Sequence, residues 1–438
     1  MSDLTPPSRD PVLTRRKLLV SGAAGAAGLY GLSAARAFGA VPASLVREIG
    51  SGTVTFGSNY SDPTPHKALL ATLRKFSKQT GITIDRNDVD HNTFQEQINS
   101  YLQGTPDDVF TWFAGYRMQF FAQKGLLTPI DDVWAKLKPV FSPAFARAST
   151  GLDGKKYFVP IYNYPWAVFY RRSLFKAKGY TAPTTWDQFI ALAKKMKADG
   201  NPMSFTDKDG WPAMGTFDYI NMRINGYDFH VRLMAGKESW DSARVKSVFN
   251  TWRELIPYYQ PGFLGRTWQE GGTSLANKKT GMYVLGSFVA IQFTDPAAAK
   301  DLDFFAFPQI NPKWDRDSVE APIDGFLLSK KPKNEEGAKA LLAYFGSKAA
   351  ADTWLAIDHS IVGANKRTSQ ANYTVLQKKS AKLISSAKHI SQYMDRDTRP
   401  DFASTVMIPA LQQFLNKPND VNSLVKSIEK QKKAIFTS

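Results

Sequence analysis

The sequence of 438 residues contains no cysteine, so the chain can form no disulfide and has no thiol nucleophile. It also lacks a G-x-S-x-G nucleophile elbow, an H-E-x-x-H pair and a phosphate-binding P-loop. Its five histidines do not cluster with acidic residues, as metal ligands would. The sequence therefore predicts neither an enzyme, nor a cofactor, nor a metal centre.

Long apolar runs are absent as well, and no segment is apolar enough to span a bilayer. The N-terminus differs from the rest, because Arg15 and Arg16 precede an Ala-, Gly- and Leu-rich stretch without charge until Arg36. Ala35-Arg36-Ala37 fits the A-x-A pattern that a signal peptidase cleaves. The arginine pair resembles a twin-arginine export signal. We expect residues 1–37 to be a signal peptide that is removed on export.

The absence of cysteine also means that the mature chain has no site for a lipid anchor. An exported protein without an anchor stays with the cell only where an outer membrane encloses it, so we expect a location in the periplasm. The formal net charge of +17 would fit nucleic acid, an anionic surface or an acidic ligand. The basic residues, however, are scattered, and no nucleic-acid-binding motif occurs. We therefore predict a solvated basic surface and no nucleic-acid partner.

Apolar runs alternate with amphipathic segments in the first part of the chain. Strands are predicted at 54–56, 82–84 and 108–112, and a helix with apolar positions 69, 70, 73 and 76 ends at Gly81. Thr93 and Glu96 predict a capping box for a second helix. This alternation is typical of an α/β fold.

The remaining chain is mostly helical to about residue 280, then has strands near 281–285, 303–307 and 326–328. A helix is predicted at 335–345, and the stretch from 349 is helical and basic. This order predicts two lobes built from discontinuous segments and joined by a hinge near 160–166, 303–308 and 348. Two lobes on a hinge enclose a cleft that closes on a ligand.

Seven short stretches resemble motifs of the family 1 extracellular solute-binding proteins, a group that includes maltodextrin receptors. They occur in the family's order: PDDV (106–109), GLLTPID (125–131), GKKYFVP (154–160), YRRSLF (170–175), PTTWDQF (183–189), NKKTGM (277–282) and GFLLS (325–329).

The resemblance implies a periplasmic-binding-protein-like fold of two α/β lobes, with 38–162 and 303–348 in one lobe and 163–302 and 349–438 in the other. It also implies a monomeric receptor that binds a sugar in the cleft and delivers it to the permease of an ABC importer.

A sugar presents apolar C–H faces and a rim of hydroxyls, so its site needs aromatic rings and short polar side chains. Such residues occur in loops after predicted strands, at the predicted hinge and in the loops that the family uses. We predict that the ligand is bound by Asn59, Tyr60, Asp62, Trp112, Tyr162, Trp166, Trp211, Asp218, Ser287, Phe288, Asp324 and Gly325.

Other residues of interest have structural explanations. Trp252 lies on a helical stripe and is predicted to be core, and Asp107 and Asp108 are predicted to order a turn. His66 and His91 are expected to be solvated. If the sugar is anionic, its charge would be met by basic residues, for which the candidates are Arg117, Arg171, Arg223 and Arg367.

Alternative functions stay open. Related ferric-ion receptors use adjacent tyrosines, and Tyr258-Tyr259 is such a pair. A polyamine receptor would need clustered acids in the cleft, which a basic chain does not favour. A secreted carbohydrate-active enzyme would need two carboxylates whose spacing in space a sequence does not give. A surface adhesion module is disfavoured because repeats and all-β patterning are absent. The sequence favours a sugar receptor.

Overall fold

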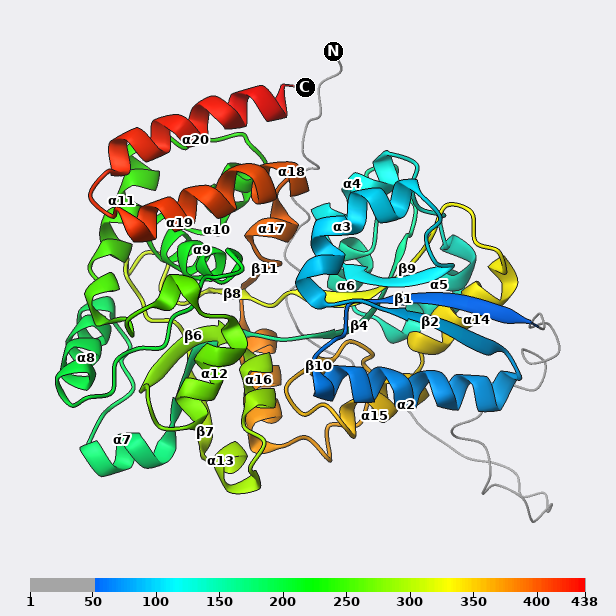
Figure 1. The fold of residues 1–438 in the computed structure, drawn as a ribbon, viewed down its shortest axis with the longest axis horizontal. Helices are drawn as coiled ribbons and strands as arrows, with labels where there is room; N and C mark the ends of the chain where they lie inside the picture. The colour runs from blue at the N-terminus through cyan, green and yellow to red at the C-terminus, as the bar shows by residue number, and fades with distance from the viewer. Residues whose placement is uncertain (1–51, 438) are drawn as a thin grey trace, which may run out of the picture. The chain divides into compact units, whose positions relative to one another are not determined.

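The computed structural model describes residues 52–437, and the predicted signal peptide at 1–37 lies outside them. The α/β prediction is confirmed for the described residues, which form a six-stranded, a three-stranded and a two-stranded sheet (Figure 1). No helix in this part of the chain combines the length and apolarity needed to cross a bilayer.

The first sheet has the strand order β10-β4-β9-β3-β1-β2. β1 is parallel to both β2 and β3, whereas β9 is antiparallel to β3 and β4. Its strands are β1 (Thr53–Ser58), β2 (Thr83–Asp88), β3 (Val109–Phe113), β4 (Phe158–Asn163), β9 (Ile323–Leu328) and β10 (Val362–Gly363).

Helices cover both faces of this sheet, as the apolar β3 requires. Val109 belongs to the main hydrophobic core, and its neighbour Phe110 belongs to a second core with Phe94 and Phe121, because alternate residues of a strand point to opposite faces. The helices on this side are α2 (Pro63–Thr80), α3 (His91–Gln103), α4 (Tyr116–Gln123), α5 (Asp131–Leu137), the 3₁₀ turn η1 (Lys138–Val140), α6 (Pro143–Ala148), α14 (Glu335–Phe345) and α15 (Lys348–Leu355).

The predicted helix ends are partly confirmed. α2 ends at Gly81, whose φ of 78° is the left-handed conformation that glycine adopts without strain. The predicted capping box of Thr93 and Glu96 is wrong. The Asp90 side chain caps α3 by accepting hydrogen bonds from the N–H groups of Asn92 and Thr93, because the helix begins three residues earlier than predicted.

The second sheet has the order β6-β5-β7 and is antiparallel throughout. Its strands are β6 (Met282–Gly286), β5 (Trp166–Arg171) and β7 (Leu302–Phe305), and the short parallel pair is β8 (Ser318–Glu320) with β11 (His389–Ser391).

Helices surround these strands, and α9 packs against α10, α11, α19 and β8. They are α7 (Arg172–Lys178), α8 (Trp186–Ala198), α9 (Pro212–Asn225), α10 (Tyr227–Met234), α11 (Ala243–Arg253), η2 (Ile256–Tyr258), η3 (Phe263–Gly265), α12 (Trp268–Ala276), η4 (Ser287–Gln292), α13 (Pro296–Asp301), α16 (Val375–Ser386), α17 (Met394–Asp397), α18 (Pro400–Phe402), η5 (Ala403–Met407), α19 (Ile408–Asn416) and α20 (Val421–Phe436).

The chain passes between the two larger sheets three times. One passage lies where the sequence predicted it, and the other two lie elsewhere. The first passage, between β4 and β5, falls at 164–165 as expected. The second falls at 321–322, not 303–308, because β7 pairs with β5 in the second sheet. The third follows β10, not residue 348, because α15 packs on α2 and β10 pairs with β4. Strand pairing is not visible in a linear comparison of motifs, which explains both differences.

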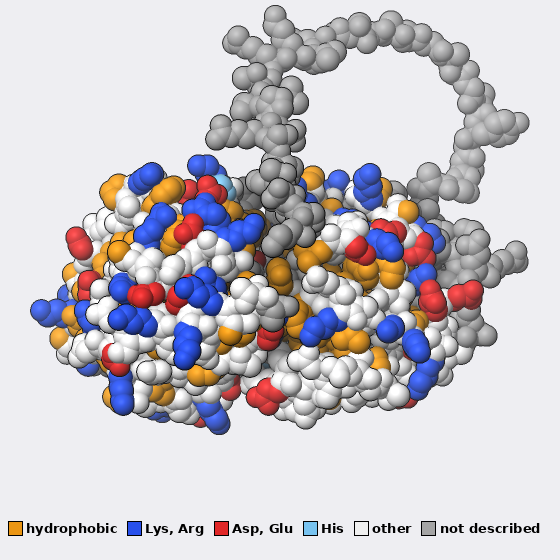
Figure 2. Space-filling model, turned by 90° about the horizontal axis from the view of Figure 1, so that it is seen from above, with side chains coloured by type: hydrophobic (Ala, Val, Ile, Leu, Met, Phe, Trp, Pro, Cys, Tyr) orange, Lys and Arg blue, Asp and Glu red, His pale blue; other side chains and the backbone are white. Residues whose placement is uncertain are grey.

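The charged surface agrees with the sequence-based expectation on the face that Figure 2 shows. Lys and Arg side chains are spread over this face and interspersed with Asp and Glu, and they do not form one continuous patch. On this face the arrangement is typical of a solvated surface.

Candidate functional site

One cavity collects residues from both larger sheets. It is bounded by the loops after β1 and β3, by the passages at 164–165 and 321–322, by the start of α9 and α12, and by the turn at 393–396. It is lined by Asn59, Tyr60, Asp62, Pro65, His91, Gln95, Trp112, Phe113, Tyr162, Tyr164, Trp166, Trp211, Trp268, Phe288, Ile291, Pro322, Asp324, Asp358, Ser360, Ile361, Tyr393, Asp395 and Arg396.

Nine of the twelve predicted binding residues are among these lining residues. They are Asn59, Tyr60, Asp62, Trp112, Tyr162, Trp166, Trp211, Phe288 and Asp324. The predicted residues of the first sheet meet because β1, β3 and β4 run in the same direction, so the carboxyl ends of these strands and the loops after them lie at one edge of the sheet. Trp166, Trp211 and Phe288 come from the side of the second sheet.

Five rings on the side of the second sheet form what we call the aromatic wall: Trp166, Trp211, Trp268, Phe288 and Tyr393. Trp166 and Tyr393 lie 4.9 Å apart between ring centroids, and Trp268 meets Phe288 edge to face at 4.9 Å. Trp166 is also edge to face with Trp211 at 6.3 Å. Such a continuous set of faces and edges suits the apolar C–H surface of a sugar ring.

A glycine makes room for the central ring of this wall. A Cβ atom on Gly215 of α9 would lie 2.5 Å from the indole of Trp166, closer than carbon atoms pack. The small residue therefore lets α9 approach β5 and fixes where Trp166 can lie.

The side of the first sheet supplies what we call the polar wall: Asn59, Asp62, His91, Gln95 and Asp324. The Asn59 amide Nδ2 is buried and has no hydrogen-bond partner among the described residues. The indole Nε1 atoms of Trp112 and Trp211, which also line the cavity, are likewise without a partner in this part of the chain. Three such donors beside one cavity are available to a ligand that carries acceptor oxygens.

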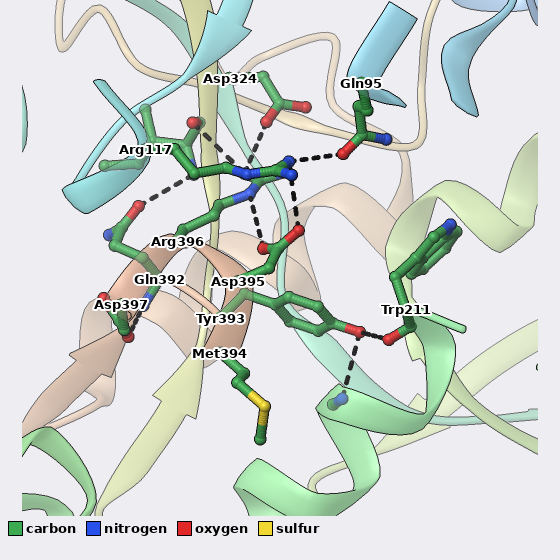
Figure 3. Close-up of polar contacts among 12 residues, drawn as sticks. Gln95, Arg117, Trp211, Asp324, Gln392, Tyr393, Met394, Asp395, Arg396 and Asp397 are labelled. Carbon is green, nitrogen blue, oxygen red and sulfur yellow. Dashed lines mark hydrogen bonds and ion pairs between the residues drawn. The ribbon is translucent and has the colours of Figure 1, made fainter. Parts of the chain in front are cut away.

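Two buried ion pairs join the turn at 393–396 to the side of the first sheet (Figure 3). Arg396 Nη1 lies 2.7 Å from Asp324 Oδ1, and Arg396 Nη2 donates to the Tyr164 hydroxyl at 3.1 Å. Arg117 Nη1 lies 3.3 Å from Asp395 Oδ2. These guanidinium groups therefore neutralise two of the carboxylates that line the cavity.

The charge balance of the cavity does not favour an anion. Four aspartates line it, against the single guanidinium of Arg396. Burial raises the pKa of Asp62, Asp324 and Asp358. Desolvation and, to a lesser degree, the charge of Arg396 lower the pKa of His91 to about 4, so this imidazole is neutral at pH 7. The cavity thus has no excess positive charge to bind a carboxylate, sulfate or phosphate.

Tyr393 has a strained backbone. Its φ of 116° and ψ of 147° fall in a region that residues other than glycine rarely adopt, at a cost of about 1–3 kcal/mol. The hydroxyl donates to the Trp211 carbonyl and accepts from Gly215 N at 3.2 Å, which holds the ring against Trp166. This backbone conformation lets Tyr393, Asp395 and Arg396 all reach the cavity.

Three of the predicted binding residues lie elsewhere. Asp218 is fully buried behind the aromatic wall, where its carboxylate accepts a hydrogen bond from Met394 N. The Ser287 hydroxyl donates to the Ser360 carbonyl and is buried. Gly325 belongs to β9, where a Cβ atom would lie 2.1 Å from the Val159 carbonyl oxygen, so it serves the close approach of two strands.

The four arginines proposed for an anionic ligand do not line the cavity. Arg117 lies behind it, Arg171 donates to the Thr280 carbonyl, Arg223 donates to the Phe307 carbonyl, and Arg367 is exposed. The arginine that does line it, Arg396, was not predicted.

Sequence analysis also missed Gln95, Trp268, Asp358, Ser360, Tyr393 and Asp395, and it expected His91 to be solvated, whereas His91 lines the cavity. The sequence did contain a signal for Tyr393, Asp395 and Arg396. The run Tyr393-Met394-Asp395-Arg396-Asp397 mixes aromatic and charged residues just before Pro400, which does not fit an uninterrupted basic helix.

The remaining expectations on single residues agree with the structure. Trp252 is fully buried in the core. Asp108 accepts a hydrogen bond from Thr55 N, and Asp107 accepts one from the Tyr101 hydroxyl, so both carboxylates fasten loops. His66 lies at the surface beside Asp88.

The adjacent tyrosines do not form a metal site with the cavity. The Tyr259 hydroxyl accepts from Trp252 Nε1 at 2.8 Å, and its ring stacks on Phe205. Neither Tyr258 nor Tyr259 lines the cavity. Residues 52–437 contain no group of three or more His, Asp or Glu side chains suited to hold a metal ion.

Comparison with known proteins gives a consistent result. The model of the bacterial extracellular solute-binding protein family matches residues 60–352, more than half of the chain. An uncharacterised ABC transporter extracellular-binding protein of Pyrococcus horikoshii is 27% identical over 291 residues, which are 66% of this chain and 65% of that protein. A "probable sugar-binding periplasmic protein" of Rhizobium meliloti is 24% identical over 52% of this chain and 55% of its own. The chain thus spans less than two thirds of these curated relatives.

A solved structure matches over a longer stretch. The bacterial solute receptor AcbH, for which an exclusive substrate preference for β-D-galactopyranose is reported, is 50% identical to this chain. The match has a TM-score of 0.86 and covers 88% of this chain and 100% of that one. The periplasmic-binding-protein-like fold expected from the motifs is therefore confirmed. The chain is a member of the bacterial extracellular solute-binding protein family.

Proposed function

We propose that the protein is the sugar receptor of an ABC importer and that it binds one neutral hexopyranose, β-D-galactopyranose or a close relative, in the cavity between the two larger sheets. The observation that carries the proposal is the set of buried, unpartnered donors on Asn59, Trp112 and Trp211 beside the aromatic wall. Ring hydroxyls accept from such donors while the C–H face of the sugar packs on indole rings.

The charges of the cavity support a neutral ligand. Asp324 and Asp395 are each paired with an arginine, so neither offers a free negative charge to a polyamine. Asp62 and Asp358 have no cationic partner, but burial raises the pKa of both and so disfavours their charged forms. Aspartates that accept from sugar hydroxyls need no positive charge on the ligand. The 50% identity to a galactopyranose receptor supports the same choice of sugar.

Binding is coupled to closure in this proposal. The two lobes are 52–163 with 323–363, and 166–320 with 364–437, joined at the three passages between the sheets. The sugar stabilises the closed form because only that form brings the polar and aromatic walls to it together. The monomeric, closed receptor then docks on the permease. Export by the signal at 1–37 and a location in the periplasm without a lipid anchor belong to the same proposal.

The first experiment is isothermal titration calorimetry of the purified protein with D-galactose, D-glucose, D-galacturonate, maltose and spermidine. We expect one site for D-galactose and at least tenfold weaker binding of D-galacturonate, because the cavity has no excess positive charge. A ligand at 100 times its Kd also stabilises the fold by about 2.7 kcal/mol, which a thermal-shift assay detects.

The outcomes are distinct. Binding of D-galacturonate but not D-galactose would overturn the neutral ligand, and binding of spermidine alone would overturn the sugar. Binding of maltose alone would keep the receptor and replace the single hexose by an oligosaccharide. Ferric citrate in the same panel tests the metal alternative.

A further inference from the structure

Behind the aromatic wall lies a group of buried ionisable side chains that the proposed site does not use. Asp218 of α9, Glu320 of β8 and His230 of α10 are all 0% exposed. Asp218 lies 4.0 Å from His230 and accepts a hydrogen bond from Met394 N, in the turn that carries Tyr393 and Arg396 to the cavity. Glu320 is the last residue of β8, which packs on α9 and pairs with β11 directly before this turn.

The hydrogen bonds of this group are incomplete. Asp218 Oδ2 accepts from Met394 N at 2.7 Å. No N–H or O–H of the described residues is placed to donate to Asp218 Oδ1 or to either carboxyl oxygen of Glu320. A buried carboxylate without donors is strongly disfavoured, so the two groups do not both carry a charge.

Only Arg223 supplies a positive charge to this group, and its effect on the pKa of Glu320 is smaller than those of burial and of the charge of Asp218. His230 Nδ1 is 4.0 Å from Asp218 Oδ1, but burial lowers the pKa of this histidine to about 3, so it is neutral. The groups that face the pair from α9, α10, β8 and the turn are Tyr219, Arg223, His230, Tyr393, Asp395 and Asp397, and of these only Arg223 is cationic.

We propose that Asp218 and Glu320 share one proton and that this carboxyl pair positions the turn at 393–396 for ligand binding. The proton stays on the Glu320 carboxyl, which donates a hydrogen bond to Asp218 Oδ1. Asp218 Oδ2 accepts a hydrogen bond from Met394 N. The pair is a positioning element: it does not touch the ligand and acts through Met394 on Tyr393 and Arg396.

The opposite end of the turn is held in a similar way. Asp397 Oδ2 accepts from Ser391 Oγ at 2.8 Å and from Gln392 N at 2.9 Å. Carboxylates thus fix both flanks of Tyr393, whose backbone is strained and therefore depends on such contacts.

Burial raises the pKa of both groups, and the charge of Asp218 raises that of Glu320 further. Both values lie above those of the unfolded chain, so the positioned turn is favoured at lower pH and is lost as pH rises and the shared proton leaves. The two negative charges then repel each other, and the contact to Met394 N is disturbed. This inference depends on the proposed function in one respect only, namely the use of D-galactose as the ligand in the binding test.

The test compares the pH dependence of the wild-type protein with that of Glu320→Gln and Asp218→Asn. In E320Q the side-chain amide donates permanently to Asp218, and in D218N the new amide donates to Glu320, so neither variant needs the proton. We expect the Kd for D-galactose to rise by up to about tenfold per pH unit above the pKa of the pair in the wild type. Both variants keep a flat profile between about pH 7 and 9.5, above the value of about 6 to which burial raises the pKa of Asp397.

Two further variants separate the pair from general effects. Glu336→Gln, on the exposed start of α14, should keep the wild-type slope. Glu320→Ala, which has no donor, should weaken binding at every pH. Wild-type and E320Q profiles that run parallel up to pH 9.5 would overturn the inference.

A readout without ligand keeps the inference separate from the proposed function. The melting temperature of the ligand-free wild type should fall relative to E320Q and D218N as pH rises from about 4.5, near the ordinary pKa of a carboxyl group, to about 9.5. If D-galactose does not bind but this difference is found, the carboxyl pair stands and the sugar is wrong. If all melting curves shift together with pH, or if only added cations raise the wild-type curve, the shared proton is wrong.

Discussion

The two walls of the cavity differ in chemistry. The polar wall comes from loops at one edge of the first sheet and presents an amide donor, carboxylates and a neutral imidazole. The aromatic wall comes from β5, α9, α12, η4 and the turn at 393–396, and it presents ring faces and edges. The ion pairs of Arg396 and Arg117 connect the turn to the first sheet.

This difference indicates how the binding energy is divided. Aromatic rings supply apolar contact with little loss of side-chain entropy, whereas unpartnered donors contribute only when an acceptor arrives. We therefore expect the aromatic wall to contribute to stability and affinity together, and the polar wall to contribute mainly to affinity and specificity.

The largest effect is expected from Trp166→Ala. The ring is fully buried, so its removal should lower the unfolding free energy by about 3–5 kcal/mol. It should also weaken D-galactose binding by at least tenfold, or about 1.4 kcal/mol. Urea unfolding and calorimetry measure the two quantities. Trp252→Ala, in the core away from the cavity, is the control and should lose stability without losing affinity. Unchanged affinity in W166A would remove Trp166 from the site.

A somewhat smaller effect is expected from Asp324→Asn, which breaks the ion pair between the walls. Arg396 would be left buried beside a neutral amide, at a cost of about 3 kcal/mol in unfolding free energy. The matched control is Asp352→Asn, because Asp352 pairs with Lys348 at the surface and should change stability by less than about 0.5 kcal/mol. Equal losses in both variants would show that the buried pair has no special role.

Asn59→Ala sharpens the comparison further. The Nδ2 atom has no partner in the described chain, so its loss should change the unfolding free energy without sugar by less than about 1 kcal/mol. Affinity for D-galactose should fall by about tenfold. Asn365→Ala is the opposite case, because its amide donates to the Gly346 carbonyl at 2.8 Å, and it should lose stability but keep affinity. A stability loss in N59A as large as in N365A would contradict the assignment.

The effect of His91 is confined to acidic pH and vanishes at pH 7. Its pKa of about 4 in the folded protein lies below the ordinary value near 6.5, so the unfolded chain binds the proton more readily between these values. Stability is therefore complete above about pH 6.5 and falls as pH decreases towards 4. His91→Gln should reduce this fall in urea unfolding at pH 7 and pH 5, whereas His66→Gln at the surface should not. Identical slopes for H91Q and the wild type would refute the desolvated environment.

Much of the fold and of the site could be predicted from local patterns. Strands with alternating or continuous apolar residues and helices with clear stripes were recognised, and Glu335–Phe345 was placed at its observed ends. Asn59 and Trp112 were found because they lie at or just after the ends of strands, and such positions meet at the edge of a sheet. Trp166 was found because it lies at the predicted hinge.

The predictions of site residues that failed are those that depend on contacts between distant segments of the chain. Arg396 is 72 positions away from Asp324, and no local signal in the sequence links them. Asp218 lies on a helix beside residues of the cavity, but the turn of that helix directs its carboxylate to the other side of the aromatic wall. The position of a residue along the chain does not tell which face of the packed structure it meets.

The sequence by itself determined the α/β class, the family, the absence of thiol chemistry and most of the loops around the cavity. These follow from composition, periodicity and short motifs, which are local properties. Only the tertiary structure decided that the cavity lacks excess positive charge in a chain of net charge +17, and that a strained turn brings Arg396 to Asp324. The physical reason is that charge balance, burial and pKa depend on which side chains are neighbours in space, and this is fixed by packing.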